Sequence, residues 1–400
     1  MASEPVHSLL IGYAGLLGAV LGSFLNVCIL RWGVEPKQSV VRPRSSCPRC
    51  GQAIPWHENV PILSWILLRG RCSGCGQPIS PLYPAVELTT ALLWAGSVAL
   101  LGPTLPALQL AVAATLLLGI AVSDARAFII PHEFSLGGAA IALGFAVVGG
   151  GGPGLWAAVQ GALFGAGVVL LVGEVTELIL DQEAMGGGDC ALMGMVGAFF
   201  GWEAVLPVLA LGACISLVLY IVAALLPRRP EPEEAPADDE PATLRWGKVF
   251  KLLAGGVGLV LVMGLALRAG SLPQLLVGLF HAGLGAGAAY YLSLAIPQRL
   301  ATGRWPRVRG LLGAAAGVAL GGGGAWESVV AGAALALAAL AAAGGTELAA
   351  PPDTNEELSA GGYLPFGVGL ALAAGLLAYA GGYDRVRQAF AELGPALGLS

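Results

Sequence analysis

The sequence predicts an all-α polytopic membrane protein with about twelve transmembrane helices. Three observations lead to this fold class: 56% of the 400 residues are hydrophobic, only 11% are charged, and the mean hydropathy is +0.78. This composition lies outside the range of soluble globular proteins, which excludes a secreted enzyme or a nucleic-acid binder. The 61 glycines are typical of spans whose backbones pack closely in a lipid bilayer.

The first transmembrane helix is expected within residues 1–30, and the basic loop at 31–81 sets its orientation. That loop contains only two acidic residues, Glu35 and Glu58. By the positive-inside rule, the loop is cytoplasmic and the N-terminus lies outside. The basic residues are Arg31, Lys37, Arg42, Arg44, Arg49, Arg69 and Arg71.

Apolar runs after this loop predict the remaining crossings. They lie near 82–101, 105–123, 134–149, 154–180, 190–202, 204–226, 249–268, 273–296, 309–325, 328–345 and 364–381. Alternation places two further basic groups in the cytoplasm, as the positive-inside rule requires. These groups are Arg228 with Arg229, and Arg299, Arg304, Arg307 and Arg309, whereas Arg268, Arg385 and Arg387 fall outside.

Composition divides the chain after the loop into four parts. Residues 82–226 form a core of spans, and 227–248 include a proline-rich acidic stretch that we expect to be a disordered cytoplasmic linker. Residues 249–347 add inserted transmembrane helices, and 348–400 contain the final span and a tail.

Four of the seven cysteines form two Cys-x-x-Cys pairs in the basic loop, each followed by glycine: Cys47, Cys50, Cys72 and Cys75. Such pairs can present four thiolates to zinc as a tetrahedron. Two disulfides are the alternative, but they are rare in the reducing cytosol. The all-cysteine set predicts a closed structural zinc site in a small zinc-ribbon-like domain, whereas Cys28, Cys190 and Cys214 lie in apolar segments and are interpreted as core residues.

Two aspartates, Asp124 and Asp189, stand at the edges of predicted spans, and alternation places both at the cytoplasmic face. Two carboxylates brought together in a poorly solvated site share a proton, so one can activate water and the other can protonate a leaving amine. The alternative is that each is an ordinary charge near a helix end. Glu174 and Glu177 either line a polar groove or mark a solvated helix end.

A glycine run directly precedes Asp189. Because glycine has no side chain, an extended substrate could lie closely against this backbone. Gly186 and Gly188 are therefore candidate residues of a substrate groove.

These motifs, in this order, resemble those of the type IV prepilin peptidases, which are membrane aspartyl proteases of the GxGD class. The resemblance covers roughly residues 15–226 and 363–381. The matching segments are 22–27 with Arg31, 44–51, Trp56, 58–59, Pro61, 63–65, 69–72, 83–84, Glu87, Asp124 with 130–131, 186–189 and 365–367.

The resemblance implies a function and its residues. The enzyme would use Asp124 and Asp189 to cut the leader from type IV prepilins or pseudopilins of type IV pilus and type II secretion systems. Cleavage would occur at the cytoplasmic face of the bacterial inner membrane. Pro365 and Gly367 would open the last span beside the groove. Members with the four-cysteine loop also N-methylate the new terminal residue with S-adenosylmethionine, whose binding residues the sequence does not identify.

Three features depart from the family pattern. Ala191 stands where a lysine is common, and His132 stands where an acidic or amide residue is usual. The third is the segment 228–347, whose even number of predicted spans returns the chain to the cytoplasmic side. We expect this insertion to be peripheral to catalysis and either to bind a membrane partner or lipid, or to pack inertly.

The sequence is also compatible with two other classes of function. One is a proton-coupled transporter with the two acids as a proton relay. The other is a non-catalytic zinc-ribbon scaffold of a secretion or pilus machine. The particular pilin and the oligomeric state do not follow from the sequence.

Overall fold

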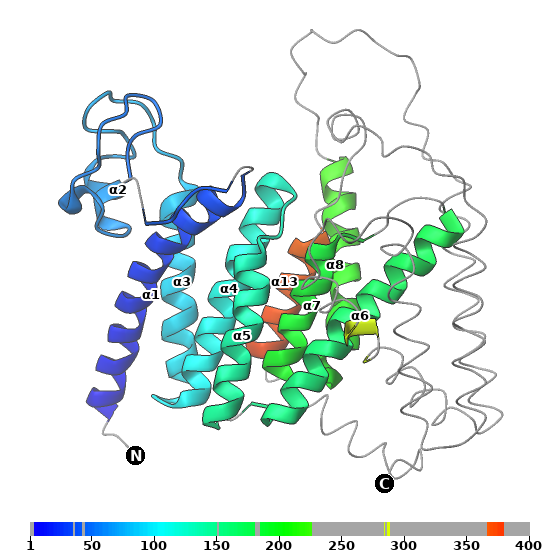
Figure 1. Ribbon diagram of the computed structural model, residues 1–400. Helices are drawn as coiled ribbons and strands as arrows, with labels where there is room; N and C mark the ends of the chain where they lie inside the picture. The colour runs from blue at the N-terminus through cyan, green and yellow to red at the C-terminus, as the bar shows by residue number, and fades with distance from the viewer. Residues whose placement is uncertain are drawn as a thin grey trace, which may run out of the picture. The chain divides into compact units, whose positions relative to one another are not determined.

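The computed structural model describes residues 4–34, 37–41, 45–149, 152–180, 185–225, 284, 286–288 and 366–379, which are drawn in colour in Figure 1. Within these residues the fold is helical, and the only β pairing is two isolated bridges. The chain divides into two compact units. The first comprises Met1–Ala162, Ala191–Ile215 and Pro365–Val386, and the second comprises Leu163–Cys190, Ser216–Leu364 and Arg387–Ser400.

Eight long helices are described: α1 (Glu4–Trp32), α3 (Leu82–Leu101), α4 (Leu105–Ala127), α5 (His132–Val148), α6 (Leu155–Leu180), α7 (Gly187–Phe200), α8 (Val205–Leu225) and α13 (Phe366–Tyr379). Three short ones join them: η1 (Trp56–Glu58), α2 (Leu63–Leu67) and η2 (Trp202–Ala204). Five stretches are long and apolar enough to cross a membrane: Pro5–Trp32, Leu82–Leu101, Leu105–Ala127, Leu155–Glu177 and Trp202–Leu219. Helices α5 and α7 are apolar but shorter, with 17 and 14 residues.

The predicted spans up to 226 and the last one are helices, so the polytopic helical class is confirmed for this part of the chain. The linker at 227–248 and most of the four inserted spans lie outside the described residues, and the count of about twelve helices stays a prediction. Of the inserted segment, residues 286–288 are helical, and Gly287 lies directly against the Leu163 carbonyl of α6.

Several helix boundaries differ from the predicted ones by a few residues, and two of these differences involve a candidate aspartate. Helix α4 continues beyond 123 to Ala127, because its backbone hydrogen bonds extend through polar residues until Phe128 adopts a left-handed conformation with φ 53°. Helix α7 begins at Gly187 instead of 190. Both aspartates therefore lie within terminal helical turns and not in the adjoining loops.

Small residues bring α1 and α3 together, and Figure 1 shows these helices side by side. A Cβ at Gly18 would lie 2.7 Å from the Thr90 carbonyl oxygen, and one at Gly22 would lie 2.8 Å from the Cα of Glu87. Larger side chains at these positions would push the helices apart. The glycine at 22, part of the opening motif, therefore serves helix packing.

Helix α4 is the central element of the first unit, since it packs against α1, α3, α5 and α13. Polar side chains add bonds between these apolar helices. The Trp94 Nε1 donates to Thr115 Oγ1 at 2.9 Å, and the Tyr379 hydroxyl of α13 donates to the Leu93 carbonyl at 2.7 Å. Helix α13, which lies within the last predicted span, thus belongs to the same bundle as the helix that carries Asp124.

Candidate active site and metal centre

The four cysteines form two turns with the same backbone hydrogen bonds. The amide of Cys47 donates to the Gln52 carbonyl and that of Cys72 donates to the Gln77 carbonyl, both at 2.9 Å. An antiparallel bridge closes each turn, Ser46 with Ala53 and Arg71 with Pro78. The glycines that follow the pairs, Gly51 and Gly76, have φ of 73° and 68°, a conformation that residues with a Cβ seldom adopt.

The two turns bring the sulfur atoms to spacings that suit a metal. All four Sγ atoms lie within 4.8 Å of one another, and those of Cys47 and Cys75 are 3.9 Å apart. Zn–S bonds of about 2.3 Å in a tetrahedron place neighbouring sulfurs about 3.8 Å apart. The four thiols, Cys47, Cys50, Cys72 and Cys75, therefore fit a structural zinc ion.

The pKa values of two of these thiols are shifted in opposite directions. Hydrogen bonds from the backbone amides of Cys50 and Arg49 lower the pKa of Cys47 from 9.0 to about 6. The amide of Gln77 likewise lowers the pKa of Cys75, but desolvation and the three neighbouring thiol side chains raise it to about 11. A cation bound among the four sulfurs would stabilise the thiolate form of every one of them.

Asp124 lies in the last turn of α4, and its side chain is only 6% exposed. Its carbonyl accepts the Phe128 amide at 2.9 Å, which closes the helix. The chain then runs through residues 129–130 to Pro131, whose carbonyl accepts the Phe134 amide at 3.1 Å and so starts α5. The carboxyl group of Asp124 is thus buried at a tight corner between two helices.

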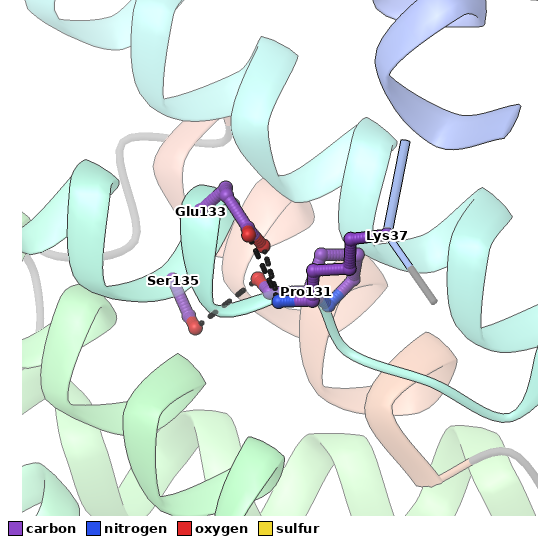
Figure 2. A network of polar contacts seen from close by, with 4 residues as sticks. All are labelled: Lys37, Pro131, Glu133 and Ser135. Carbon is purple, nitrogen blue, oxygen red and sulfur yellow. Dashed lines mark hydrogen bonds and ion pairs between the residues drawn. The ribbon is translucent and has the colours of Figure 1, made fainter. Parts of the chain in front are cut away.

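A clamp from the loop after α1 holds this corner (Figure 2). The Nζ of Lys37 lies 2.8 Å and 2.9 Å from the two carboxylate oxygens of Glu133, in the first turn of α5. One residue on, the Phe134 ring packs edge-on against Trp32 at the end of α1, with 5.0 Å between ring centroids. The corner next to Asp124 is therefore tied to the segment that leads into the four-cysteine loop.

Asp189 lies in the first turn of α7, where it caps the helix. Its Oδ2 accepts the Gly186 amide at 3.3 Å, and its own amide donates to the Gly186 carbonyl at 3.1 Å. The bond from the Gly186 amide to the carboxylate is the half of a capping box that an acid at the third helical position supplies, whereas Gly186 has no side chain to supply the other half. A carboxylate there also interacts favourably with the helix dipole.

Two of the three glycines before Asp189 are not required by the backbone or by packing within the part that the structure describes. Neither Gly186 nor Gly187 has a positive φ. A Cβ at Gly186 would make only ordinary contacts, the nearest at 3.8 Å, and one at Gly187 would meet nothing within 4 Å among the described residues. The predicted groove role of this run therefore stays open to test.

The structure describes most, but not all, of the other predicted site residues. Asp124 belongs to the first unit and Asp189 to the second, so the pairing of their carboxylates stays a prediction. Glu174 is buried and Glu177 is half-buried. Gly188 lies in the first turn of α7 and Gly367 in the first turn of α13, whereas Pro365 lies outside the described residues.

Sequence reasoning missed two contacts that position these elements. It counted Lys37 only as a topological charge, although this side chain pairs with Glu133 across 96 residues. It placed Glu87 in a motif without a role, although its carboxylate accepts the Ile62 amide at 2.7 Å. No periodic pattern relates residues so far apart, and only the complementary charges of Lys37 and Glu133 gave a signal.

Comparison with known proteins identifies the family. The family model described as the bacterial peptidase A24 N-terminal domain matches residues 16–101. The model described as the type IV leader peptidase family matches residues 111–221, which include Asp124 and Asp189.

Three bacterial relatives share the name prepilin leader peptidase/N-methyltransferase. The protein from Myxococcus xanthus is 41% identical over 250 residues, covering 59% of this chain and 72% of the relative. The protein from Burkholderia pseudomallei is 34% identical over 275 residues, covering 62% and 88%. The protein from Aeromonas hydrophila is 35% identical over 233 residues, covering 53% and 80%.

No solved structure matches the chain. The two family models together follow the order of the motifs, from the first span through the four-cysteine loop to the segment of Asp189. The chain belongs to the type IV leader peptidase family.

Proposed function

We propose that this membrane enzyme, a peptidase and methyltransferase, removes the N-terminal leader from type IV prepilins or pseudopilins and methylates the new terminal residue. The observation that carries this proposal is the similarity to relatives named prepilin leader peptidase/N-methyltransferase, at 34–41% identity. The two family models match the four-cysteine loop and both aspartate segments. The names of these relatives do not favour a scaffold or a transporter.

Two aspartates carry the proteolysis in this proposal. Asp124 is buried at the end of α4, and Asp189 caps the start of α7. With one proton shared between them, one carboxylate takes a proton from water as it attacks the scissile carbonyl. The other donates its proton to the leaving amine. The reaction needs no covalent intermediate with the protein.

The membrane determines how the substrate is oriented relative to the active site. The prepilin's apolar helix would stay in the bilayer while its basic leader lies in the cytoplasm, on the side that the positive-inside rule assigns to the four-cysteine loop. The leader would extend along the backbone of the glycine run, in contact with Gly186 and Gly188. The site would lie at the cytoplasmic face of the inner membrane, with the N-terminus of the chain outside.

Two bound groups complete the proposal. Zinc would be held by Cys47, Cys50, Cys72 and Cys75, where it would fold the loop and take no part in either reaction. S-adenosylmethionine, when bound, supplies an electrophilic methyl group to the amine that cleavage exposes.

A reconstituted reaction tests this function. Purified protein in liposomes is mixed with a prepilin carrying its leader, with and without S-adenosylmethionine labelled in the methyl group. We expect leader release in both reactions and label on the mature pilin only with the donor. An intact prepilin in a preparation that retains its fold would refute the proposal, and release without label would limit it to the peptidase.

The groove role of the glycine run is tested by two neighbouring substitutions. Gly186→Ala and Gly187→Ala should both fold, because neither added Cβ comes closer than 3.8 Å to a described atom. We expect Gly186→Ala to slow cleavage by roughly 10- to 100-fold, since the methyl group displaces the substrate backbone, and Gly187→Ala to have little effect. Equal initial rates for the two variants would contradict the groove.

The Lys37–Glu133 clamp should affect activity more than stability. Both side chains are about one-third exposed (36% and 33%), so Lys37→Ala should cost roughly 1 kcal/mol or less. Loss of the clamp should nevertheless slow cleavage by up to roughly 100-fold, because it displaces the corner that holds Asp124. The charge-reversed double variant, Lys37→Glu with Glu133→Lys, should recover most of the rate; no recovery would show that the pair itself is not what matters.

A further inference from the structure

The short helix α2 (Leu63–Leu67) presents an apolar face that no described part of the protein covers. Leu63, Ile66 and Leu67 are 51%, 58% and 71% exposed. Positions i, i+3 and i+4 lie on one side of a helix, so these three side chains form a single face. We refer to them as the α2 face. Contiguous apolar surface in a loop outside the spans marks a site of interaction.

The rest of α2 is turned inward by specific bonds, so the exposure of this face is built into the loop. Ser64 is buried; its Oγ accepts the Val60 amide at 2.9 Å and donates to the His57 carbonyl at 3.2 Å. The indole of Trp65 donates to the Ile79 carbonyl at 3.2 Å, and its ring lies against Gly70. With Ser64 and Trp65 held inside the loop, the α2 face must point outward.

A bond to a membrane span fixes the depth of α2. The Ile62 amide, directly before α2, donates to the carboxylate of Glu87 at 2.7 Å. Glu87 is five residues into α3, which corresponds to about 7 Å of helix rise beyond the start of that span. Ile62 has a φ of 62°, which is rare for a β-branched residue and is stabilised by this bond. The start of α2, directly after Ile62, thus lies at the level of the first turns of a transmembrane helix.

The charges around α2 complement an anionic surface. Arg49, Arg69 and Arg71 are exposed, and Arg69 and Arg71 follow α2 within four residues. Glu58 is the only acidic residue at 45–81, and its carboxylate accepts a hydrogen bond from Ser73 at 2.8 Å. Among the described residues, no carboxylate lies within ion-pair distance of these three arginines. An apolar face flanked by arginines is the pattern of a helix that lies in the headgroup region.

We propose that α2 is an interfacial helix that docks the four-cysteine loop on the anionic cytoplasmic leaflet. The α2 face enters the boundary between headgroups and acyl chains, and the flanking arginines contact lipid phosphates. Docking holds the loop at a fixed height above the spans. A prepilin docked on the same face is the competing occupant, but the bond to Glu87 places α2 at the lipid interface whether or not substrate is present.

Photo-crosslinking in the full-length protein tests this docking. A benzophenone amino acid replaces Leu67 in protein reconstituted into nanodiscs of phosphatidylethanolamine and phosphatidylglycerol, and intact mass after irradiation identifies the adducts. The control position is Gln77, an exposed residue of the second cysteine turn. We expect phospholipid adducts at position 67 and none above background at position 77. Lipid adducts at neither position, or equally at both, would overturn the proposal.

Further conditions test the role of lipid charge and distinguish lipid from prepilin as the partner of the α2 face. With phosphatidylcholine in place of phosphatidylglycerol, the adduct yield should fall severalfold, and Arg69→Gln with Arg71→Gln should lower the yield in anionic discs to the same level. An unchanged yield in both cases would overturn the role of the charges. Irradiation with added prepilin should leave the lipid adducts in place, and their replacement by pilin adducts would assign the face to the substrate instead.

Discussion

Replacement of either Asp124 or Asp189 by Asn should abolish leader cleavage, with a fall in rate of roughly 10⁴-fold or more. Asn has nearly the same shape as Asp but cannot share the proton that the mechanism requires. At position 189 the amide oxygen of Asn can still accept the Gly186 amide and cap α7. The Asn variant therefore removes the acid–base chemistry and keeps the helix start, and the initial rate of leader release measures the effect.

A carboxylate elsewhere provides the control for this experiment. Glu203 lies in η2 after α7, and Glu203→Gln replaces its carboxyl group by an amide, as Asp→Asn does. We expect this variant to retain activity. If Asp189 served only as a helix cap, Asp189→Asn would cleave at nearly the normal rate, and the assignment of this residue as catalytic would be wrong. Activity in Asp124→Asn would remove the other half of the pair in the same way.

Replacement of Cys72 by Ser should release the metal and impair methylation more than cleavage. Loss of one thiolate of four opens the zinc site, and the metal content should fall from about one ion per chain to near zero. The loop would then lose the geometry that the two cysteine turns give it, while α4 and α7, which carry the aspartates, keep their own helical hydrogen bonds. Metal analysis and the ratio of methylated to unmethylated mature pilin measure both effects.

Two variants control for the metal. Cys72→His keeps a zinc ligand and should recover most of the metal content and of the methylation. Cys214→Ser changes a cysteine of α8 outside the cluster, which is exposed and not a core residue as the sequence predicted, and should alter neither. Equal loss of cleavage and methylation in Cys72→Ser would instead assign the four-cysteine loop a role in folding the whole protein.

The helices could be predicted because a span must be long and apolar, and the loop because its cysteines repeat at metal-ligand spacing. The helix ends could not, because hydrogen bonds continue past the last apolar residue: Asp124 and Asp189 lie inside helical turns that the hydropathy of the chain does not mark. A span in lipid is apolar on all sides, so its pattern does not show which face packs inward.

The contacts that position the candidate site could not be predicted from the sequence, for a related reason. Lys37 and Glu133 are far apart in the chain, and each alone is an ordinary surface charge. The bond from Ile62 to Glu87 depends on a backbone amide, which every residue except proline possesses. The glycines allowed a better prediction of helix packing. The sequence predicts that spans pack closely at glycines, and the glycine at 22 packs closely against α3.

Cleavage and methylation of a prepilin by this chain can both be detected by intact-mass spectrometry of a candidate prepilin from cells that express the protein. Cells with the Asp189→Asn variant provide the comparison. Our expectation is a pilin that has lost its leader and gained the mass of one methyl group only with the unaltered protein. An unprocessed prepilin in both strains, with both proteins present in the membrane, would contradict it.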